Sequence, residues 1–128
     1  MTPTQALSTL RIISALFMLA HGIARIIVPE GVSGFGGFLE SLGFPFSLGI
    51  AWLLTILELA GAALLITGYA VRVAAAFYMA ELLAGILLVH GENGWFVVGL
   101  TNGGMEYNVF LIICFLLIYL TNHKPKVA

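Results

Sequence analysis

The sequence has 128 residues, of which 61% are hydrophobic and 9% are charged, and its mean hydropathy is +1.09. Soluble domains carry roughly 25% charged residues, so this chain has too few charges to cover a surface that faces water. Its formal net charge of −1 provides no basic surface for nucleic acid. Composition therefore predicts a protein that is embedded in a lipid bilayer.

The first apolar run, residues 7–28, predicts a membrane-spanning helix. A helix of about 20 residues crosses a hydrocarbon core of about 30 Å, and this run is long enough. Arg11 and Arg25 lie near its two ends, where their long side chains can reach the lipid headgroups. Pro29 ends the helix, because proline has no backbone N–H to donate. The run is too long for the apolar core of a signal peptide, so none is expected.

Residues 29–48 form the first long connection. Glycines interrupt this segment too often for a membrane span, yet its phenylalanine and leucine side chains are too apolar for a solvated loop. A short helix at about Phe35–Leu42 that lies on the membrane surface is the expected structure.

Three further spans are expected at residues 49–67, 71–89 and 105–120. A tight connection at 68–71 joins the second and third spans, and a second long connection at 90–104 precedes the fourth. The predicted fold class is therefore all-α. The whole chain is expected to form one integral membrane four-helix bundle, with a short interfacial helix between the first two spans.

The distribution of charge predicts the orientation of these spans. Four spans place both termini and the tight connection on one side, and that side receives the basic residues Arg11, Arg72, Lys124 and Lys126. The other side receives the acidic residues Glu30, Glu40, Glu92 and Glu106, with one basic residue, Arg25. The positive-inside rule then predicts that both termini lie in the cytoplasm and that the two long connections face the other side.

Several ionisable residues interrupt the apolar runs. A charge inside a bilayer costs roughly 2.5–3.5 kcal/mol and usually faces the protein interior beside a partner. His21 and Arg25 are four residues apart and so share one face of the first helix. Glu58, in the middle of the second span, is one expected partner of Arg25, and Glu106 is the other. An ion pair that only fixes helix register is as good an explanation as a functional site.

His21, His90 and Glu106 are expected to lie at the same mouth of the bundle. A hydrogen-bonded core position is the alternative for His21, and stabilisation of a helix N-terminus is the alternative for Glu106. The candidate ligand-binding residues are therefore His21, Arg25, Glu58, His90 and Glu106. Arg11, Arg72 and Asn93 are expected to serve as helix caps or in structural ion pairs.

Glu81 is difficult to place at the same site as His90. It precedes His90 by nine residues, which places the two side chains on opposite faces of an ideal α-helix. Both can face one site only if the helix ends before His90. The alternatives are that Glu81 faces another subunit or that it is protonated.

Motifs of soluble enzymes are missing from the sequence. It has no glycine-rich phosphate loop, no nucleophile elbow and no His-Glu-x-x-His pattern. A metal site would have to use His21, His90, Met18 and Met105, whose spacing does not support one, so no metal is expected. Cys114 is the single cysteine and is expected to pack as a small apolar side chain.

The order of several short motifs resembles the DoxX family of small four-helix membrane proteins. These are Arg11, His21-Gly22, Arg25, Gly43-Phe44-Pro45, Glu58-Leu59-Ala60-Gly61, Leu65, Gly68, Arg72, His90, Asn93-Gly94-Trp95-Phe96 and Gly103-Gly104-Met105-Glu106-Tyr107. Arg25 stands where many members are expected to have lysine, and Glu106-Tyr107 resembles only part of the family. The resemblance implies an inner-membrane four-helix protein. It implies function loosely, because the family takes its name from proteins associated with a thiosulfate:quinone oxidoreductase, and similar members are linked to redox or oxidative-stress complexes.

Three functions remain open at this point. The first is an accessory or ligand-binding subunit, as a homo-oligomer or with a partner membrane subunit, that has a polar pocket near the outer leaflet. The second is a quinone-linked oxidoreductase component with quinone as its cofactor, and the lone cysteine argues against a thiol relay in it. The third is a small proton-coupled transporter that uses Glu58 and Glu81. Whether the protein is an enzyme is left open.

Overall fold

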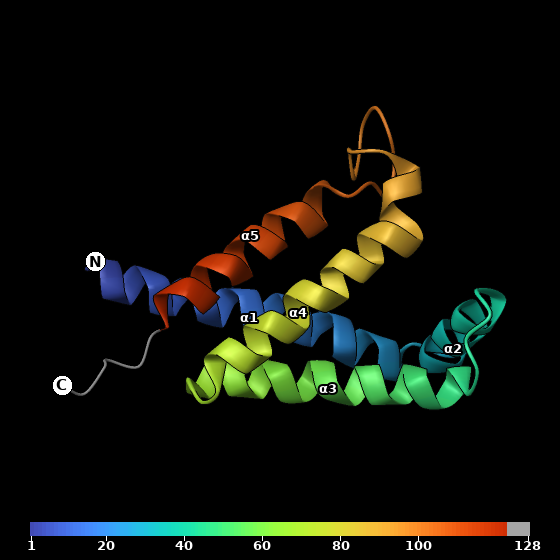
Figure 1. Ribbon diagram of the computed structural model, residues 1–128, viewed down its shortest axis with the longest axis horizontal. Helices are drawn as coiled ribbons and strands as arrows, with labels where there is room; N and C mark the ends of the chain where they lie inside the picture. Colours follow the sequence, from blue (N-terminus) through green and yellow to red (C-terminus); the bar gives the residue numbers. More distant parts are fainter. Residues whose placement is uncertain (123–128) are drawn as a thin grey trace.

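The computed structural model describes residues 1–122, and within them every regular element is helical. In chain order these are α1 (Pro3–Ile27), α2 (Gly31–Ser41), α3 (Ser47–Thr67), α4 (Val71–Gly85), the π-helix η1 (Ile86–His90), the 3₁₀-helix η2 (Gly91–Asn93) and α5 (Glu106–Thr121) (Figure 1). The all-α prediction is confirmed. Lys124 and Lys126, which contributed to the predicted orientation, lie outside the described residues.

Three helical segments are long and apolar enough to cross a membrane. They are α1, α3 and the continuous run Val71–Asn93. The fourth predicted span is α5, which is apolar but has 16 residues, fewer than the roughly 20 that cross a bilayer. A fourth crossing, and with it the four-helix membrane bundle, stays a prediction. The short helix between the first two spans is present as α2, and its place at a membrane surface also stays a prediction.

The helix ends follow from local sequence. The Thr2 hydroxyl accepts from the Gln5 backbone N–H while the Gln5 side chain accepts from the Thr2 N–H, so a reciprocal cap starts α1. Val28 is extended (ψ 130°), as a residue before proline prefers, and it ends the same helix. Gly68 ends α3 with φ at +79°, a conformation that glycine adopts without steric cost. The predicted tight connection is therefore confirmed at residues 68–70.

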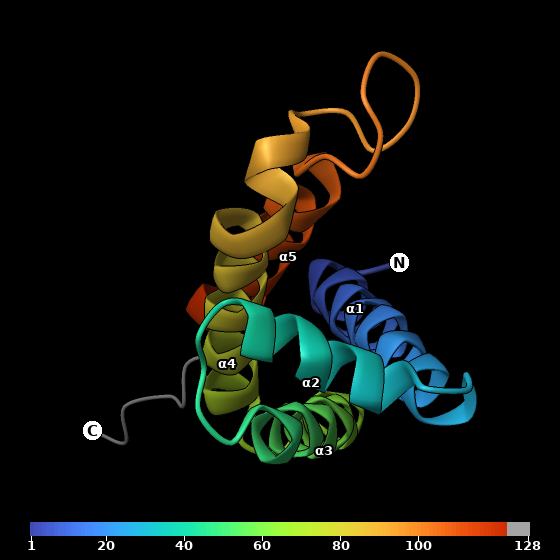
Figure 2. The ribbon, with the colours of Figure 1, turned by 90° about the vertical axis from the view of Figure 1, so that its right-hand side faces the viewer.

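The chain forms two limbs that are joined once, through residues 68–70. The first limb contains α1, α2 and α3, and the second contains α4, η1, η2 and α5. Within the limbs α1 packs along α3, α2 crosses the start of α3, and α4 packs along α5, whereas contacts between the limbs are fewer. The limbs meet at the end that holds the N-terminus and the α3–α4 turn, here called the closed end (Figure 1). They diverge toward the open end, which holds α2 and the loop at residues 94–105 (Figure 2).

The closed end contains the main apolar core. Its largest fully buried side chains include Leu65, Tyr78, Phe115 and Ile118. The rings of Tyr78 and Phe115 stack with centroids 5.0 Å apart. A Cβ at Gly61 would lie 3.0 Å from the Tyr78 hydroxyl oxygen, so α3 and α4 approach closely because that position has no side chain. The Tyr78 hydroxyl donates to the backbone carbonyl of Glu58, which marks where the core ends.

The outer faces of the long helices carry large exposed apolar side chains. Examples on four different helices are Phe17, Leu53, Leu83 and Phe110, which are between about half and two thirds exposed. Such surfaces are expected where lipid is the solvent. Cys114 is buried in α5, in agreement with its expected role as a packed apolar residue.

Candidate functional site

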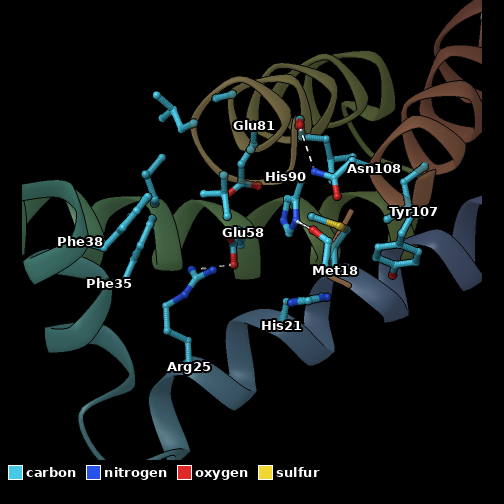
Figure 3. A pocket seen from close by; sticks show the side chains of 18 of the residues that line it. Met18, His21, Arg25, Phe35, Phe38, Glu58, Glu81, His90, Tyr107 and Asn108 are labelled. Atoms are coloured by element: carbon cyan, nitrogen blue, oxygen red, sulfur yellow. Dashed lines mark hydrogen bonds and ion pairs between the residues drawn. The ribbon is translucent and has the colours of Figure 1, made fainter. Parts of the chain in front are cut away.

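A cavity of about 350 Å³ lies between the two limbs at the open end (Figure 3). Side chains from both limbs line it, and most of its wall is apolar. The polar side chains of the lining are His21, Arg25, Glu58, Glu81, His90, Tyr107 and Asn108. Its apolar side includes Met18, Phe35, Phe38, Leu39, Leu54, Leu82, Leu88, Val89, Val97 and Leu111. A concave, mostly apolar site with a few convergent polar groups is the usual form of a small-molecule site.

Arg25 forms an ion pair with Glu58 across the floor of the cavity. Its Nη1 atom is 3.0 Å from Glu58 Oε2 and 3.1 Å from the Thr55 hydroxyl oxygen. The guanidinium carbon also lies 4.6 Å from the centroid of the Phe35 ring, which brings α2 over the pair. The Glu58 side chain is 3% exposed and that of Arg25 is 20% exposed. Of the two partners that the sequence allowed for Arg25, the structure selects Glu58.

Glu106 lies outside the cavity lining, although the sequence placed it among the ligand-binding candidates. Its Oε1 atom accepts from the backbone N–H of Val97 at 3.0 Å. The Asn93 side chain donates to the carbonyl of Gly103 at 3.4 Å. Both contacts fasten the loop at residues 94–105, so both side chains shape the open end without facing its interior.

The two histidines come from different limbs, His21 from α1 and His90 from η1 (Figure 3). His90 Nδ1 is 2.8 Å from the carbonyl oxygen of Gly103. Because a carbonyl oxygen only accepts, Nδ1 carries the hydrogen and Nε2 is left for another partner. His21 is exposed rather than buried, and its ring centroid is 6.4 Å from that of Tyr107. The core alternative for His21 is therefore wrong.

The π-helix η1 explains how Glu81 and His90 both reach the cavity. The α-helical part of α4 ends at Gly85, and the Gly91 N–H donates to the carbonyl of Ile86, five residues earlier. A π-turn holds more residues than an α-turn, so His90 moves around the axis from its ideal α-helical position. The sequence allowed Glu81 and His90 to face one site only if the α-helix ended before His90, and the α-helix does end there. Glu81 lines the cavity of its own chain, and the alternative in which it faces another subunit stays a prediction.

Glu81 presents the unusual polar atom of this site. Its Oε2 is buried and, within residues 1–122, has no hydrogen-bond partner. The carboxyl group points toward that of Glu58 (Figure 3). Buried side-chain oxygens almost always have a partner, and π-turns often occur at functional sites. A proton held between the Glu81 and Glu58 carboxyl groups would supply the missing partner.

Asn108 was not among the residues selected from the sequence. It is buried in the first turns of α5, and its Nδ2 donates to the carbonyl of Leu82 at 3.1 Å. This bond ties α5 to α4 just before the π-turn. A Cβ at Gly85 would lie 3.0 Å from the same Nδ2. The Asn108 amide therefore fits here because residue 85 has no side chain. The sequence feature that could have identified Asn108 is that it is an asparagine at the start of an otherwise apolar run.

Arg11 and Arg72 lie at the closed end, away from the cavity. The Arg11 guanidinium lies against Gly68 at the C-terminus of α3, where a positive charge is favoured by the helix dipole. The guanidinium carbon of Arg72 is 4.2 Å from the Tyr119 ring centroid. Over residues 1–122 no group of three or more His, Cys, Asp or Glu side chains is placed to hold a metal ion.

The DoxX family model matches residues 6–91 of this chain, which is more than half of its length. The chain belongs to the DoxX family. The matched part includes Arg25, Glu58, Glu81 and His90, whereas the motif at residues 93–107 lies outside it and its DoxX resemblance stays a prediction. No curated protein and no solved structure matches the chain. DoxX membership and the three long apolar helices together indicate a membrane protein.

Proposed function

We propose that this DoxX protein is a membrane-embedded binding subunit that takes up a small amphipathic molecule in the cavity at its open end. The observation that carries the proposal is the composition of that cavity. One wall presents the Arg25–Glu58 pair and the Glu81 side chain, and the rest is mainly aliphatic and aromatic. A polar head would lie against the charged groups, and an apolar body would lie against α2 and α4.

The position of the cavity supports this proposal. It lies where the limbs diverge, and α2 covers one side with Phe35, Phe38 and Leu39. The outer faces of the same helices are apolar, so a molecule dissolved in the bilayer could reach the cavity without crossing water. Structural ion pairing alone explains Arg25 and Glu58 but leaves the cavity without a role.

The proposed setting is the inner membrane, with both termini in the cytoplasm and the cavity near the outer leaflet. Arg11 and Arg72 at the closed end, and Glu30, Glu40 and Glu92 at the open end, support this orientation through the positive-inside rule. An accessory role in a redox or stress-response complex, alone or as an oligomer, extends the family resemblance. Reporter domains fused after Ala128 and inserted at Glu92 should be active on opposite sides of the membrane. Activity on the same side would contradict the orientation.

The first test is native mass spectrometry of protein purified in mild detergent, with lipid extraction and an absorption spectrum of the same sample. A bound small amphipathic molecule is expected. A quinone in the extract would select the oxidoreductase alternative, and flux of a solute coupled to protons in vesicles would select the transporter.

Two tryptophan substitutions on one helix provide the matched control. Ala84 lines the cavity, whereas Ala80, one turn earlier, is exposed outside the lining. Ala84→Trp should fill the site and abolish the bound molecule, and Ala80→Trp should retain it. Equal occupancy in the two variants would place the molecule elsewhere and overturn the proposal.

A further inference from the structure

The charged side chains of the cavity are one cation and two carboxyl groups. Arg25 is the cation, and its guanidinium is already paired with Glu58 at 3.0 Å and bonded to Thr55 at 3.1 Å. The Phe35 ring lies against the guanidinium as well. The positive charge therefore has a counterion, a hydrogen-bond acceptor and an aromatic ring before any molecule enters.

Glu81 adds a second carboxyl group to this pair. Its Oε2 is buried without a partner among the residues described, and its side chain points toward Glu58 (Figure 3). A second negative charge beside Glu58, in a mostly apolar cavity with one cation, would be costly. A proton on Glu81 removes that charge and makes the side chain a hydrogen-bond donor. The cavity then holds one positive charge, one negative charge and a neutral acid.

The titratable groups on the neighbouring elements are the two histidines and Tyr107. His90 donates from Nδ1 to the Gly103 carbonyl, and His21 lies beside the ring of Tyr107. In the described part of the chain neither imidazole forms an ion pair with a carboxylate. Neither histidine therefore competes with Arg25 as the counterion of Glu58.

We infer that the cavity selects an uncharged headgroup and rejects anionic amphiphiles, because Glu58 already neutralises its one cation, Arg25. This inference rests on the proposed function and names the class of ligand. An anionic head would meet the Glu58 carboxylate, which already neutralises Arg25. A cationic head would bind well only if Glu81 gave up its proton. Glu58 is thus the residue that determines charge selectivity.

The test uses three probes that share a ten-carbon chain and differ in headgroup charge: 1-decanol, decanesulfonate and decylammonium. Each is added to the protein in nanodiscs at the same mole fraction in the lipid, and occupancy is measured by native mass spectrometry. The occupancy that Ala84→Trp removes is taken as cavity binding. For the unsubstituted protein, decanol occupancy should exceed that of each charged probe at least tenfold.

Substitutions of the two carboxyl groups should act differently. Glu81→Gln keeps a neutral donor, so decanol binding should change less than threefold. Glu58→Gln combined with Glu81→Gln leaves Arg25 without a counterion, so the ratio of decanesulfonate to decanol should rise at least tenfold. Glu40→Gln, an exposed carboxylate on α2 outside the lining, is the matched control and should change neither ratio. The double variant Arg25→Gln/Glu58→Gln has neither charge and should keep the preference for decanol.

The outcomes separate the two proposals. Preference of the unsubstituted protein for decanesulfonate or decylammonium would overturn the charge selectivity and leave the binding function standing. An unchanged ratio in a folded Glu58→Gln/Glu81→Gln protein would also overturn it. If Glu58→Gln/Glu81→Gln does not fold, the preference of the unsubstituted protein and that of Arg25→Gln/Glu58→Gln decide. Failure of all three probes to bind the unsubstituted protein would overturn the binding function itself.

Discussion

The closed and open ends of this molecule use the same helices in different ways. At the closed end, the stacked rings of Tyr78 and Phe115 fill the space between the limbs, and Gly61 lets the backbones approach. At the open end the facing residues include Arg25, Glu58 and Glu81, and a cavity of about 350 Å³ remains. The comparison shows that apolar side chains fill the space between the limbs at the closed end, whereas ionisable side chains leave a cavity at the open end.

The largest effect is expected from Phe115→Ala at the closed end. Phe115 is fully buried and stacks on Tyr78, so its removal would leave a void where the limbs meet. Loss of a buried phenylalanine costs about 3–5 kcal/mol. The free energy of unfolding, measured by denaturant titration in mixed micelles, should fall by that amount. A loss below about 1 kcal/mol would show that the limbs are not held together there.

Arg25→Ala tests the open end and should cost about 3 kcal/mol. The change leaves the Glu58 carboxylate buried without a cation, and removing one partner of a buried pair costs about 3–5 kcal/mol. Arg72→Ala is the matched control, because Arg72 contacts the Tyr119 ring and removing that contact costs about 0.5–1 kcal/mol. The same unfolding titration measures both variants. Equal losses would mean that the Arg25–Glu58 pair is no more important than a surface contact.

Glycine substitutions should have smaller effects of opposite sign. Gly85→Ala would place a Cβ 3.0 Å from Asn108 Nδ2 and weaken its bond to Leu82, at a cost of about 1 kcal/mol. Gly37→Ala on α2 meets no atom within 4 Å, so it should stabilise that helix by about 0.5–1 kcal/mol. Thermal unfolding in one detergent measures both shifts. A stabilising Gly85→Ala would contradict the described packing of Asn108.

The sequence predicted the helical content and the connections because the apolar runs are long and are separated by glycine and proline. It also identified Arg25, Glu58 and His90, since ionisable groups within such runs are few. It did not predict that Glu81 shares their site, because an ideal α-helix places Glu81 opposite His90. The π-turn at Ile86–His90 changes that register, and nothing in its sequence, Ile-Leu-Leu-Val-His, signals it.

Glu106 and Asn108 are a second case in which the sequence did not predict the direction of a side chain. Both are polar residues near the start of α5, and the sequence analysis selected the charged residue, Glu106, as a ligand-binding candidate. The structure turns Glu106 toward the Val97 N–H and Asn108 toward α4, because two residues separate them by about 200° around an α-helix. Side-chain direction at a helix start depends on where the helix begins, which a sequence fixes only to within a few residues.

The single link between the limbs at residues 68–70 has a consequence for biogenesis. Each limb is one contiguous half of the chain, so a ribosome would deliver the first limb into the bilayer complete before the second emerges. The cavity comes into existence only when the halves associate, and a molecule bound between them would favour their association. Separately expressed fragments 1–69 and 70–128 should therefore reassemble in one membrane, and an occupant of the cavity should raise the yield of the reassembled protein.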